Sequence, residues 1–230
     1  MPRFHVNGNT IAFDDGGMNL LSSDALRELR DVVSSAAEGG GAPVGSAPLV
    51  FRSGRERLFA AGADMAEMAA FNAMQAADFA LLGQEVFDAI EKLPVVTVAV
   101  IDGDCFGGAL DLVLAFDLRF ATPRSRFAHP GARIGIVTGF GGTSRWRKVL
   151  SRAAARKLFL GNPVLSSQEA LEAGLVDRVA ASFDDELLRL AALDPATTRF
   201  VKELSRHGEQ LSEGELQRFG ERLARLYGLA

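Results

Sequence analysis

The run Val95–Asp102, "VVTVAVID", constrains the fold more than any other stretch, because it is almost wholly apolar and rich in β-branched residues. Such a run is typical of a strand that other elements cover on both faces, whereas a half-exposed strand alternates apolar and polar residues. The next four residues, "GDCF", predict a turn, and the pair Gly107-Gly108 predicts the start of a helix. The sequence therefore indicates a buried strand that leads through a turn into a glycine-rich helix start.

Strands and helices alternate along the first two thirds of the chain. "LVFRSG", residues 49–54, indicates another buried strand, and residues 74–93 show one apolar helical face that ends before Pro94. Two further strand candidates, "LRFATP" and "RFAHP", precede the segment "GFGG" and a basic helix. Because helices serve as crossovers between parallel strands, this order predicts an α/β core. We expect the core to occupy residues 1–182 and a shortened helical region to occupy residues 183–230.

Composition excludes several classes of protein. The 230 residues are 48% hydrophobic, enough for one sizeable core, and the net charge of −4 argues against a nucleic-acid binder. Cys105 is the sole cysteine in the sequence, which excludes an intramolecular disulfide and a cysteine-clustered zinc site. The first residues, "MPRFHVNGNTIAFDD", lack the apolar core of a signal peptide, and no apolar run reaches the roughly 18 residues of a membrane span. We therefore expect a cytoplasmic protein with no membrane partner.

Two small-residue loops are the main functional signals, since the sequence holds no phosphate-loop, dinucleotide, serine-hydrolase or zinc-protease motif. The loops are "FAAGADMAEM", residues 59–68, and "DCFGGALD", residues 104–111. Free backbone N–H groups at a helix start can polarise an oxygen on which negative charge develops, and glycine leaves room for that oxygen. Glycine also permits close packing, so the loops alone leave both interpretations open. Nothing in the sequence requires a metal.

The order of these segments resembles the crotonase family, also called the enoyl-CoA hydratase/isomerase superfamily. The resemblance rests on "LVFRSG", "AAGAD", "VVTVAVIDG" and "GG" with an acid three residues later, and it runs from about Ile11 to Leu226. The segments "GFGGTSRW" and "LSSQEALEAGLVDRVA" extend it. This resemblance implies a ββα spiral of two nearly perpendicular sheets with a C-terminal helical region that forms homotrimers or dimers of trimers.

The resemblance also implies an acyl-CoA thioester as the substrate, with no cofactor besides the coenzyme A of the substrate itself. The backbone N–H groups of Ala63 and Gly108 match the family's oxyanion hole, which binds the thioester carbonyl. Arg57 matches a position that is often basic, and the coenzyme A site would include Ala61, Asp64 and Met65. Asp64 would also stabilise a turn.

The carboxylates depart from the pattern of the family's hydratases. Asp111 stands where hydratases carry one glutamate, and Gly131 stands where they carry the second, after "FAHP". Without a second acid, isomerase-like chemistry through a stabilised enolate, or another non-hydratase reaction such as decarboxylation or thioester hydrolysis, is expected. Asp111 is the expected base, with a structural carboxylate at a helix N-terminus as its alternative. His129 is either a proton-transfer group or a hydrogen-bonded structural residue.

Other residues have structural interpretations. Asp104 is expected to cap the helix that begins at the glycine pair. Arg199, Lys202 and Arg206 either form a solvated face or reach a ligand across a subunit boundary. A late apolar stripe must bury against its own core or a neighbouring subunit; it comprises Leu216, Phe219, Leu223 and Leu226. An alternative function for the whole chain is a catalytically weak acyl-CoA-binding subunit, or a scaffold of the same fold.

Overall fold

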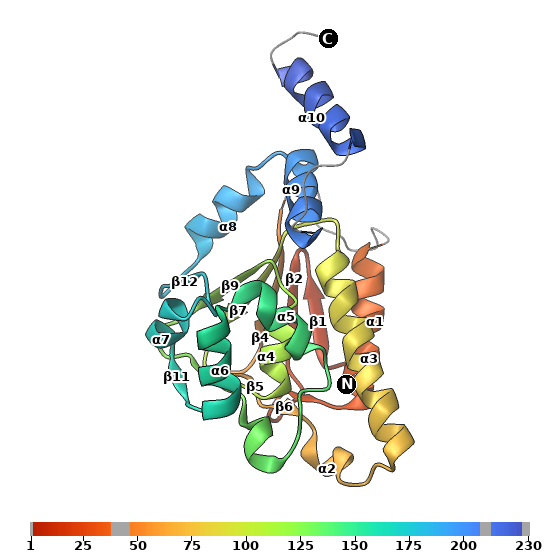
Figure 1. The fold of residues 1–230 in the computed structure, drawn as a ribbon, viewed down its shortest axis with the longest axis vertical. Coiled ribbons are helices and arrows are strands. Elements are labelled where there is room, and N and C mark those ends of the chain that lie inside the picture. Colours follow the sequence, from red (N-terminus) through yellow and green to blue (C-terminus); the bar gives the residue numbers. More distant parts are fainter. Residues whose placement is uncertain (1, 38–46, 208–212, 227–230) are drawn as a thin grey trace.

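The computed structural model describes residues 2–37, 47–207 and 213–226. Its largest sheet has six strands in the order β1-β2-β4-β7-β9-β12. They are β1 (Phe4–Asn7), β2 (Thr10–Phe13), β4 (Leu49–Ser53), β7 (Thr97–Ile101), β9 (Leu118–Ala121) and β12 (Arg178–Val179). The β1–β2 pair is antiparallel, and every other neighbouring pair in this sheet is parallel. Figure 1 shows the sheet behind the helices of the middle of the chain.

Strand β7 is the buried apolar strand that the sequence predicts. Ala99 and Ile101 on one face belong to the main hydrophobic core. Val98 on the other face packs in a second cluster with Phe120 and Phe183, on which Leu187 also packs. Both faces are therefore covered, which explains why the run shows no alternation of apolar and polar residues.

A second sheet carries the loops that matter for function. Its order is β11-β10-β8-β5, and a separate two-stranded pair joins β3 to β6. These strands are β3 (Leu20–Leu21), β5 (Leu58–Ala60), β6 (Gly62–Ala63), β8 (Asp104–Phe106), β10 (Arg126–Ala128) and β11 (Leu165–Ser166). The prediction of a turn at "GDCF" is wrong for its last three residues, because β8 pairs in parallel with both β5 and β10. The turn is confined to Gly103, whose φ of 103° brings it against the backbone of Arg57.

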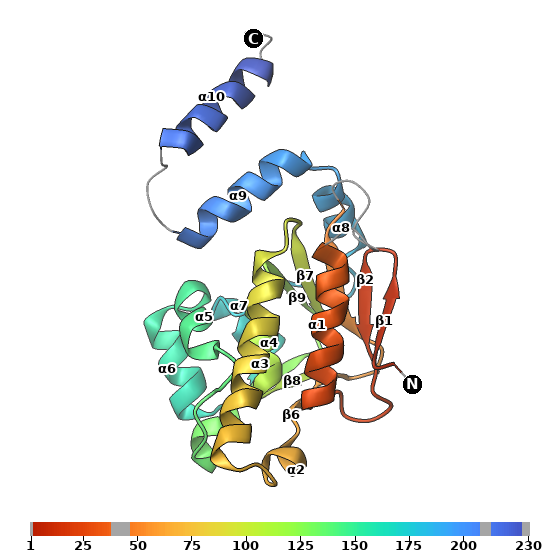
Figure 2. The same ribbon diagram turned by 90° about the vertical axis from the view of Figure 1, so that its right-hand side faces the viewer.

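Helices cover the sheets, and the C-terminal part of the chain is helical (Figures 1 and 2). They are α1 (Ser23–Ala37), α2 (Met65–Met68), α3 (Ala73–Lys92), α4 (Gly108–Val113), the 3-10 helix η1 (Pro130–Ile134), α5 (Gly142–Val149), α6 (Arg152–Gly161), α7 (Ser167–Glu172), α8 (Asp184–Ala191), α9 (Pro195–His207) and α10 (Glu213–Leu226). The predicted helix over residues 74–93 is confirmed as α3, which begins at a capping box between Asn72 and Gln75. The expected cap at Asp104 is wrong, because Gly107 precedes α4 and Asp104 instead pairs with Arg126 at 2.7 Å.

Helix α9, near the end of the chain, is attached to the large sheet through a buried lysine side chain. Lys202 on α9 is 6% exposed, its Nζ lies 2.6 Å from Oδ2 of Asp117, and it donates to the carbonyl of Val95. The expectation of a solvated face is therefore wrong for Lys202, whereas Arg199 pairs on the surface with Glu203. The Arg206 side chain lies outside the described residues. The division of the chain at residue 182 stays a prediction.

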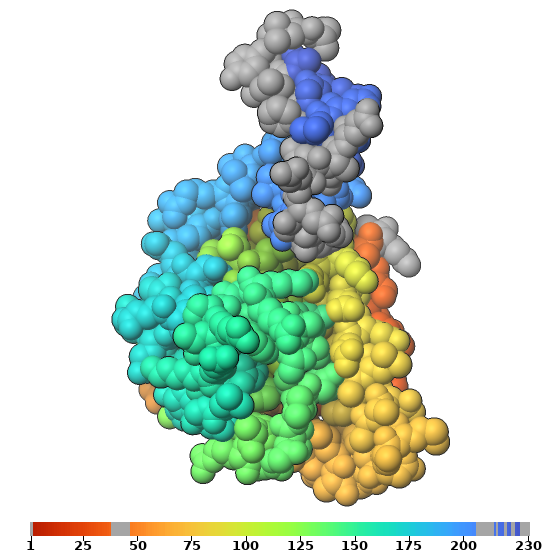
Figure 3. All heavy atoms as spheres, viewed as in Figure 1, coloured from red at the N-terminus to blue at the C-terminus, as the bar shows by residue number. Residues whose placement is uncertain are grey.

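Helix α10 stands clear of the sheets in Figure 2, and in Figure 3 the coloured atoms of this helix lie at the top of the view, beyond the main body of the molecule. It contacts α9 through the guanidinium of Arg218, 5.3 Å from the ring centroid of Phe200. Leu216 is 53% exposed, and the side chains of the other three stripe positions lie outside the described residues. In the described ranges, no helix combines the length and the apolar character needed to cross a membrane.

Candidate active site

The two small-residue loops are in direct contact. A Cβ placed on Gly62 would lie 2.9 Å from the backbone nitrogen of Gly108, and one placed on Gly108 would lie 3.4 Å from that of Ala63. Only residues without a Cβ allow so close an approach of two backbones. Ala63 and Gly108 are both partly exposed, so a ligand atom can reach this place. The loops thus bring together the two nitrogens that the sequence predicts as oxyanion donors.

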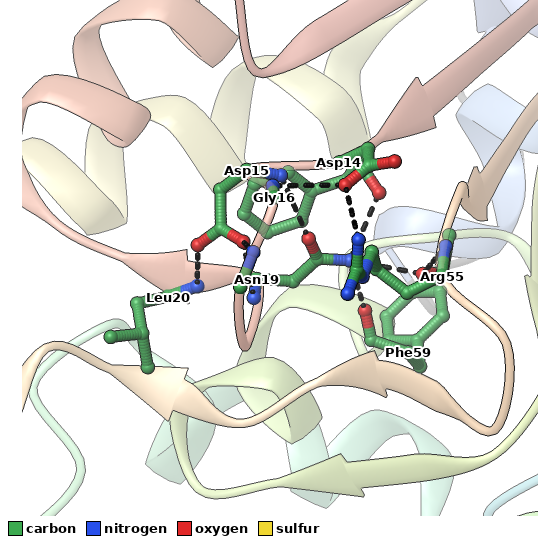
Figure 4. A network of polar contacts seen from close by, with 10 residues as sticks. Asp14, Asp15, Gly16, Asn19, Leu20, Arg55 and Phe59 are labelled. Carbon is green, nitrogen blue, oxygen red and sulfur yellow. Dashed lines mark hydrogen bonds and ion pairs between the residues drawn. The ribbon is translucent and has the colours of Figure 1, made fainter.

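The position of Ala63 depends on a polar network at the start of the chain (Figure 4). Strand β6 pairs in parallel with β3, which follows Asn19 directly. Asn19 is fully buried at φ 51°, and its Nδ2 donates to the carbonyls of Phe13 and Phe59 and to Oγ of Ser53. The Asn19 side chain therefore joins β2, β4 and β5, and β5 leads directly into the strand that carries the N–H group of Ala63. The segment "DDGGMN" is typical of a turn, but its part in the site is not predicted from the sequence.

Asp15 fixes the same turn through its carboxylate. It accepts hydrogen bonds from the backbone N–H groups of Gly17, Asn19 and Leu20 at 2.7 to 2.9 Å. Partial burial acts to raise the pKa of this carboxyl, but the hydrogen bonds, that of Leu20 first, outweigh it and lower the pKa below its ordinary value of 3.8. Asp15 is therefore held in its charged form by the backbone that it organises.

Asp111 lies one helical turn beyond Gly108 and is 1% exposed. Thr138 donates a short hydrogen bond from Oγ1 to its Oδ2. A Cβ on Gly142 would lie 1.8 Å from its Oδ1, so the carboxylate occupies space that only a glycine leaves open. Neither Thr138 nor Gly142 is among the residues that the sequence predicts for the site, although both lie in or beside the segment "GFGGTSRW".

His129 faces Asp111 across a gap. Its Nε2 lies 3.8 Å from Oδ1 of Asp111, which is longer than a hydrogen bond. Both atoms are buried, and neither has a hydrogen-bond partner within the described parts of the chain. A buried polar atom without a partner costs free energy, and such atoms deserve an explanation in terms of function or a bound group. The structure therefore brings the two predicted catalytic side chains together and leaves one polar atom of each unsatisfied.

Gly131, the position of the second hydratase glutamate, is closely packed. A Cβ there would lie 2.7 Å from the carbonyl oxygen of Ile136 and 3.1 Å from Cε1 of His129. A side chain at this position would require the backbone around Ile136 to move. The local backbone is thus adapted to the absence of a second carboxylate.

The residues expected at the coenzyme A site lie on one stretch of chain around β5, β6 and α2. Arg57 is exposed at φ 59°, and Met65 is 51% exposed. Asp64 caps α2 by accepting from the N–H groups of Ala66 and Glu67, which is the structural role expected for it. Ala61 donates its N–H to the carbonyl of Met18. Among the described residues, no group of three or more His, Cys, Asp or Glu side chains could hold a metal ion.

Comparisons with known proteins show which sequences and structures this chain resembles. The family model for "Enoyl-CoA hydratase/isomerase" matches residues 9–219. Crotonyl-CoA hydratase of Syntrophomonas wolfei is 33% identical over 162 residues, which are 70% of this chain and 61% of that protein. Methylglutaconyl-CoA hydratase of Rattus norvegicus is 33% identical over 163 residues, 71% of this chain and 50% of that protein. This chain therefore spans less than two thirds of the length of these relatives.

A solved structure of an enoyl-CoA hydratase from Bacillus anthracis aligns with a TM-score of 0.85 at 26% identity. The alignment covers 99% of this chain and 94% of that one. The predicted crotonase-like α/β fold is therefore confirmed.

Proposed function

This chain belongs to the enoyl-CoA hydratase/isomerase family, and from that premise we propose that it is an enzyme that stabilises the enolate of an acyl-CoA thioester. The observation that carries the proposal is the contact of the two small-residue loops around the nitrogens of Ala63 and Gly108. Asp111 lies one helical turn beyond Gly108 on α4, and Nε2 of His129 lies 3.8 Å from Oδ1 of Asp111. A carbonyl oxygen bound by the two N–H groups would place the acyl carbons within reach of these side chains.

The proposed reaction moves a double bond. The thioester oxygen accepts hydrogen bonds from Ala63 and Gly108, and the Asp111 carboxylate takes a proton from the α-carbon. The electron pair of the broken C–H bond forms the enolate, whose charge rests on the bound oxygen. Return of a proton to the γ-carbon completes the shift of a β,γ double bond to the α,β position, with no water consumed. Loss of one oxyanion donor would cost about 3 kcal/mol of transition-state stabilisation.

The acid–base groups favour isomerisation over hydration. Hydration in this family uses two carboxylates to activate water, and the packing at Gly131 leaves no room for the second. One base suffices for a proton shift, and we assign His129 as the group that relays the proton, because its Nε2 faces Oδ1 of Asp111. A well-placed general acid or base contributes roughly 10² to 10⁴ in rate.

The remaining parts of the proposal concern binding and assembly. Arg57 would meet a coenzyme A phosphate, and Ala61, Asp64 and Met65 would line the path of the coenzyme. No cofactor is needed beyond the coenzyme A of the substrate. We further propose a homotrimer or dimer of trimers in the cytoplasm, where the free thiol of buried Cys105 stays reduced.

Deuterium incorporation tests the proposal. In heavy water, the native protein should exchange the α-protons of acyl-CoAs and convert 3-enoyl-CoA into 2-enoyl-CoA. Asp111→Asn should slow both by about 10² to 10⁴ while acyl-CoA affinity stays within about twofold. Asp78→Asn, an exposed change on α3, is the matched control and should behave as native. Exchange at the native rate in Asp111→Asn would remove Asp111 from the mechanism.

One observation favours a second function, a catalytically weak acyl-CoA-binding subunit. Asp111 is 1% exposed beneath Thr138, so its carboxylate has little contact with the surface from which a substrate arrives. This function predicts that the native protein binds a broad panel of acyl-CoAs and exchanges none of their protons. The heavy-water experiment therefore distinguishes the two functions.

A further inference from the structure

Arg145 on α5 is buried although it carries a charge. It is 3% exposed, and its guanidinium donates to the carbonyl of Phe140 at 2.8 Å and to the carboxylates of Asp88 and Glu91 on α3. We propose that Arg145 is a positioning residue, which holds the start of α5 against α3 and thereby keeps the Asp111 carboxylate in place. The inference rests on the proposed function, in which Asp111 is the base.

The segment that precedes α5 is bound to α3 at successive residues. Gln84 of α3 donates from Nε2 to the carbonyl of Gly139 at 2.6 Å. The ring of Phe140 occupies the space above Gly83, where a Cβ would lie 2.1 Å from it. Arg145 then binds the carbonyl of Phe140 and joins it to the two acids further along α3. Residues 139–145 are therefore attached to α3 by side chains of both helices.

The partner Glu91 is held in its charged form. Burial acts to raise the pKa of this carboxyl, but the hydrogen bond and charge of Lys148, together with Arg145, outweigh it and lower the pKa below its ordinary value of 4.5. At neutral pH an anion therefore opposes the buried guanidinium. Removing one member of a buried ion pair leaves the other uncompensated, so the pair fixes the spacing of α3 and α5.

The other side of the same segment reaches the catalytic carboxylate. Thr138 directly precedes it and donates its hydroxyl to Oδ2 of Asp111, and a Cβ on Gly142 would meet Oδ1. Thr138 and His129 also line an apolar cavity of about 460 Å³ between η1, α5 and α6, so open space borders the segment there. The position of Thr138 is therefore set from α3, where Arg145 binds.

Nuclear magnetic resonance of the His129 ring tests the inference without requiring turnover. Nε2 of His129 lies 3.8 Å from Oδ1 of Asp111, so the ring-proton resonance, assigned with His129→Gln, reports where this carboxylate lies. Arg145→Met should move the resonance from its native position, and should leave it unmoved when Asp111→Asn is already present. Arg27→Met, which breaks a surface ion pair on α1, is the matched control and should keep the native resonance.

Turnover gives a second reading. Arg145→Met should slow α-proton exchange by about 10 to 10², the effect of displacing a catalytic group, while the Kd for acyl-CoA stays within about twofold. In a Thr138→Val background the same change should cost less than about threefold, because the hydroxyl through which Arg145 acts is already gone. Arg145→Lys should restore the charge but not the exchange rate, since an ammonium lacks the planar fork of the guanidinium.

A milder variant decides the matter if Arg145→Met does not fold, as judged by circular dichroism. Gln84 is exposed, and Gln84→Met frees only the carbonyl of Gly139, so the same effects are expected at smaller size.

Two results would overturn the inference. One is a His129 resonance that stays native in both Arg145→Met and Gln84→Met; the other is an equal loss of exchange from Arg145→Met with and without the Thr138 hydroxyl. If the native protein exchanges no protons, the proposed function fails, and the His129 resonance still decides whether Arg145 positions Asp111.

Discussion

At the scale of single residues, the site depends on glycines as much as on acids. Asp111 occupies the space that Gly142 leaves open, and the two loops approach each other at Gly62 and Gly108. Asp111 and His129 each keep one buried polar atom without a partner among the described residues. These two atoms, Oδ1 of Asp111 and Nε2 of His129, are the ones between which the proposed mechanism moves the proton.

Gly142→Ala should displace the Asp111 carboxylate. The new Cβ would lie 1.8 Å from Oδ1, so the carboxylate or helix α5 must move. A displacement of about 1 Å in a catalytic group costs on the order of 10² in rate, and we expect at least that loss in α-proton exchange. Gly161→Ala, where the nearest atom is 3.7 Å away, should retain native exchange. Native exchange in Gly142→Ala would show that Asp111 need not be held in place.

Gly131→Glu should not create a hydratase. The Cβ of the glutamate would lie 2.7 Å from the carbonyl oxygen of Ile136, and overpacking of this kind typically destabilises a protein by about 1 to 3 kcal/mol. Chemical denaturation should show this loss, and hydration of crotonyl-CoA should stay at the native level. A stable variant that gains hydration would mean that η1 adapts to the side chain.

At the scale of elements, the oxyanion donor on β6 is positioned by segments far away in sequence. Its partner β3 leaves the turn of Asp15 and Asn19, and Asn19 is anchored to β2, β4 and β5. Asp14 of the same turn lies 3.6 Å from the guanidinium of Arg55. The position of Ala63 thus depends on the integrity of a polar turn that contains no catalytic group.

Asp15 should make stability depend on pH in the acid range. Its pKa is lower in the folded protein than the ordinary 3.8, so its stabilisation is complete above that value and is lost as pH falls through the lowered pKa. Asp15→Asn should therefore flatten the decline in the free energy of unfolding below pH 3.8, as measured by urea denaturation. Asp185→Asn, an exposed change on α8, should leave the profile unchanged. A native-like profile in Asp15→Asn would contradict this role.

At the scale of the whole molecule, the last two helices, α9 and α10, differ in how they are attached to the rest of the protein. Helix α9 is held by the buried Lys202, whereas α10 stands clear of the sheets and exposes Leu216 (Figure 2). An amphipathic helix must bury its apolar face to gain stability. We expect α10 to find its partner surface in another copy of the chain.

Removal of residues 211–230 tests this expectation. The shortened protein should keep the melting temperature of its core within a few degrees and should lose subunits, as measured by light scattering after size exclusion. The matched control is Leu188→Ser, which removes an exposed apolar side chain from α8. An unchanged oligomer after truncation would exclude α10 as the assembly element.

Much of the fold could be predicted because its signals are local. The apolar run of β7, the capping box that begins α3 and the capping box at Ser166 each involve residues within a few positions of one another. The short strands β3, β6, β8 and β11 could not be predicted, because each forms only where another segment offers its backbone. Lys202 could not be recognised as buried for the same reason, since its partners Asp117 and Val95 lie far away in sequence.

The sequence by itself determined the family, the α/β order of elements and the identity of the residues with catalytic potential, because periodicity and motif order are properties of the linear chain. The tertiary structure alone decided that Asp111 lies between Thr138, Gly142 and His129, that Gly131 is closed to a side chain, and that an apolar cavity opens beside His129. These facts are distances between segments that are remote in sequence, and packing sets such distances only once the chain has folded.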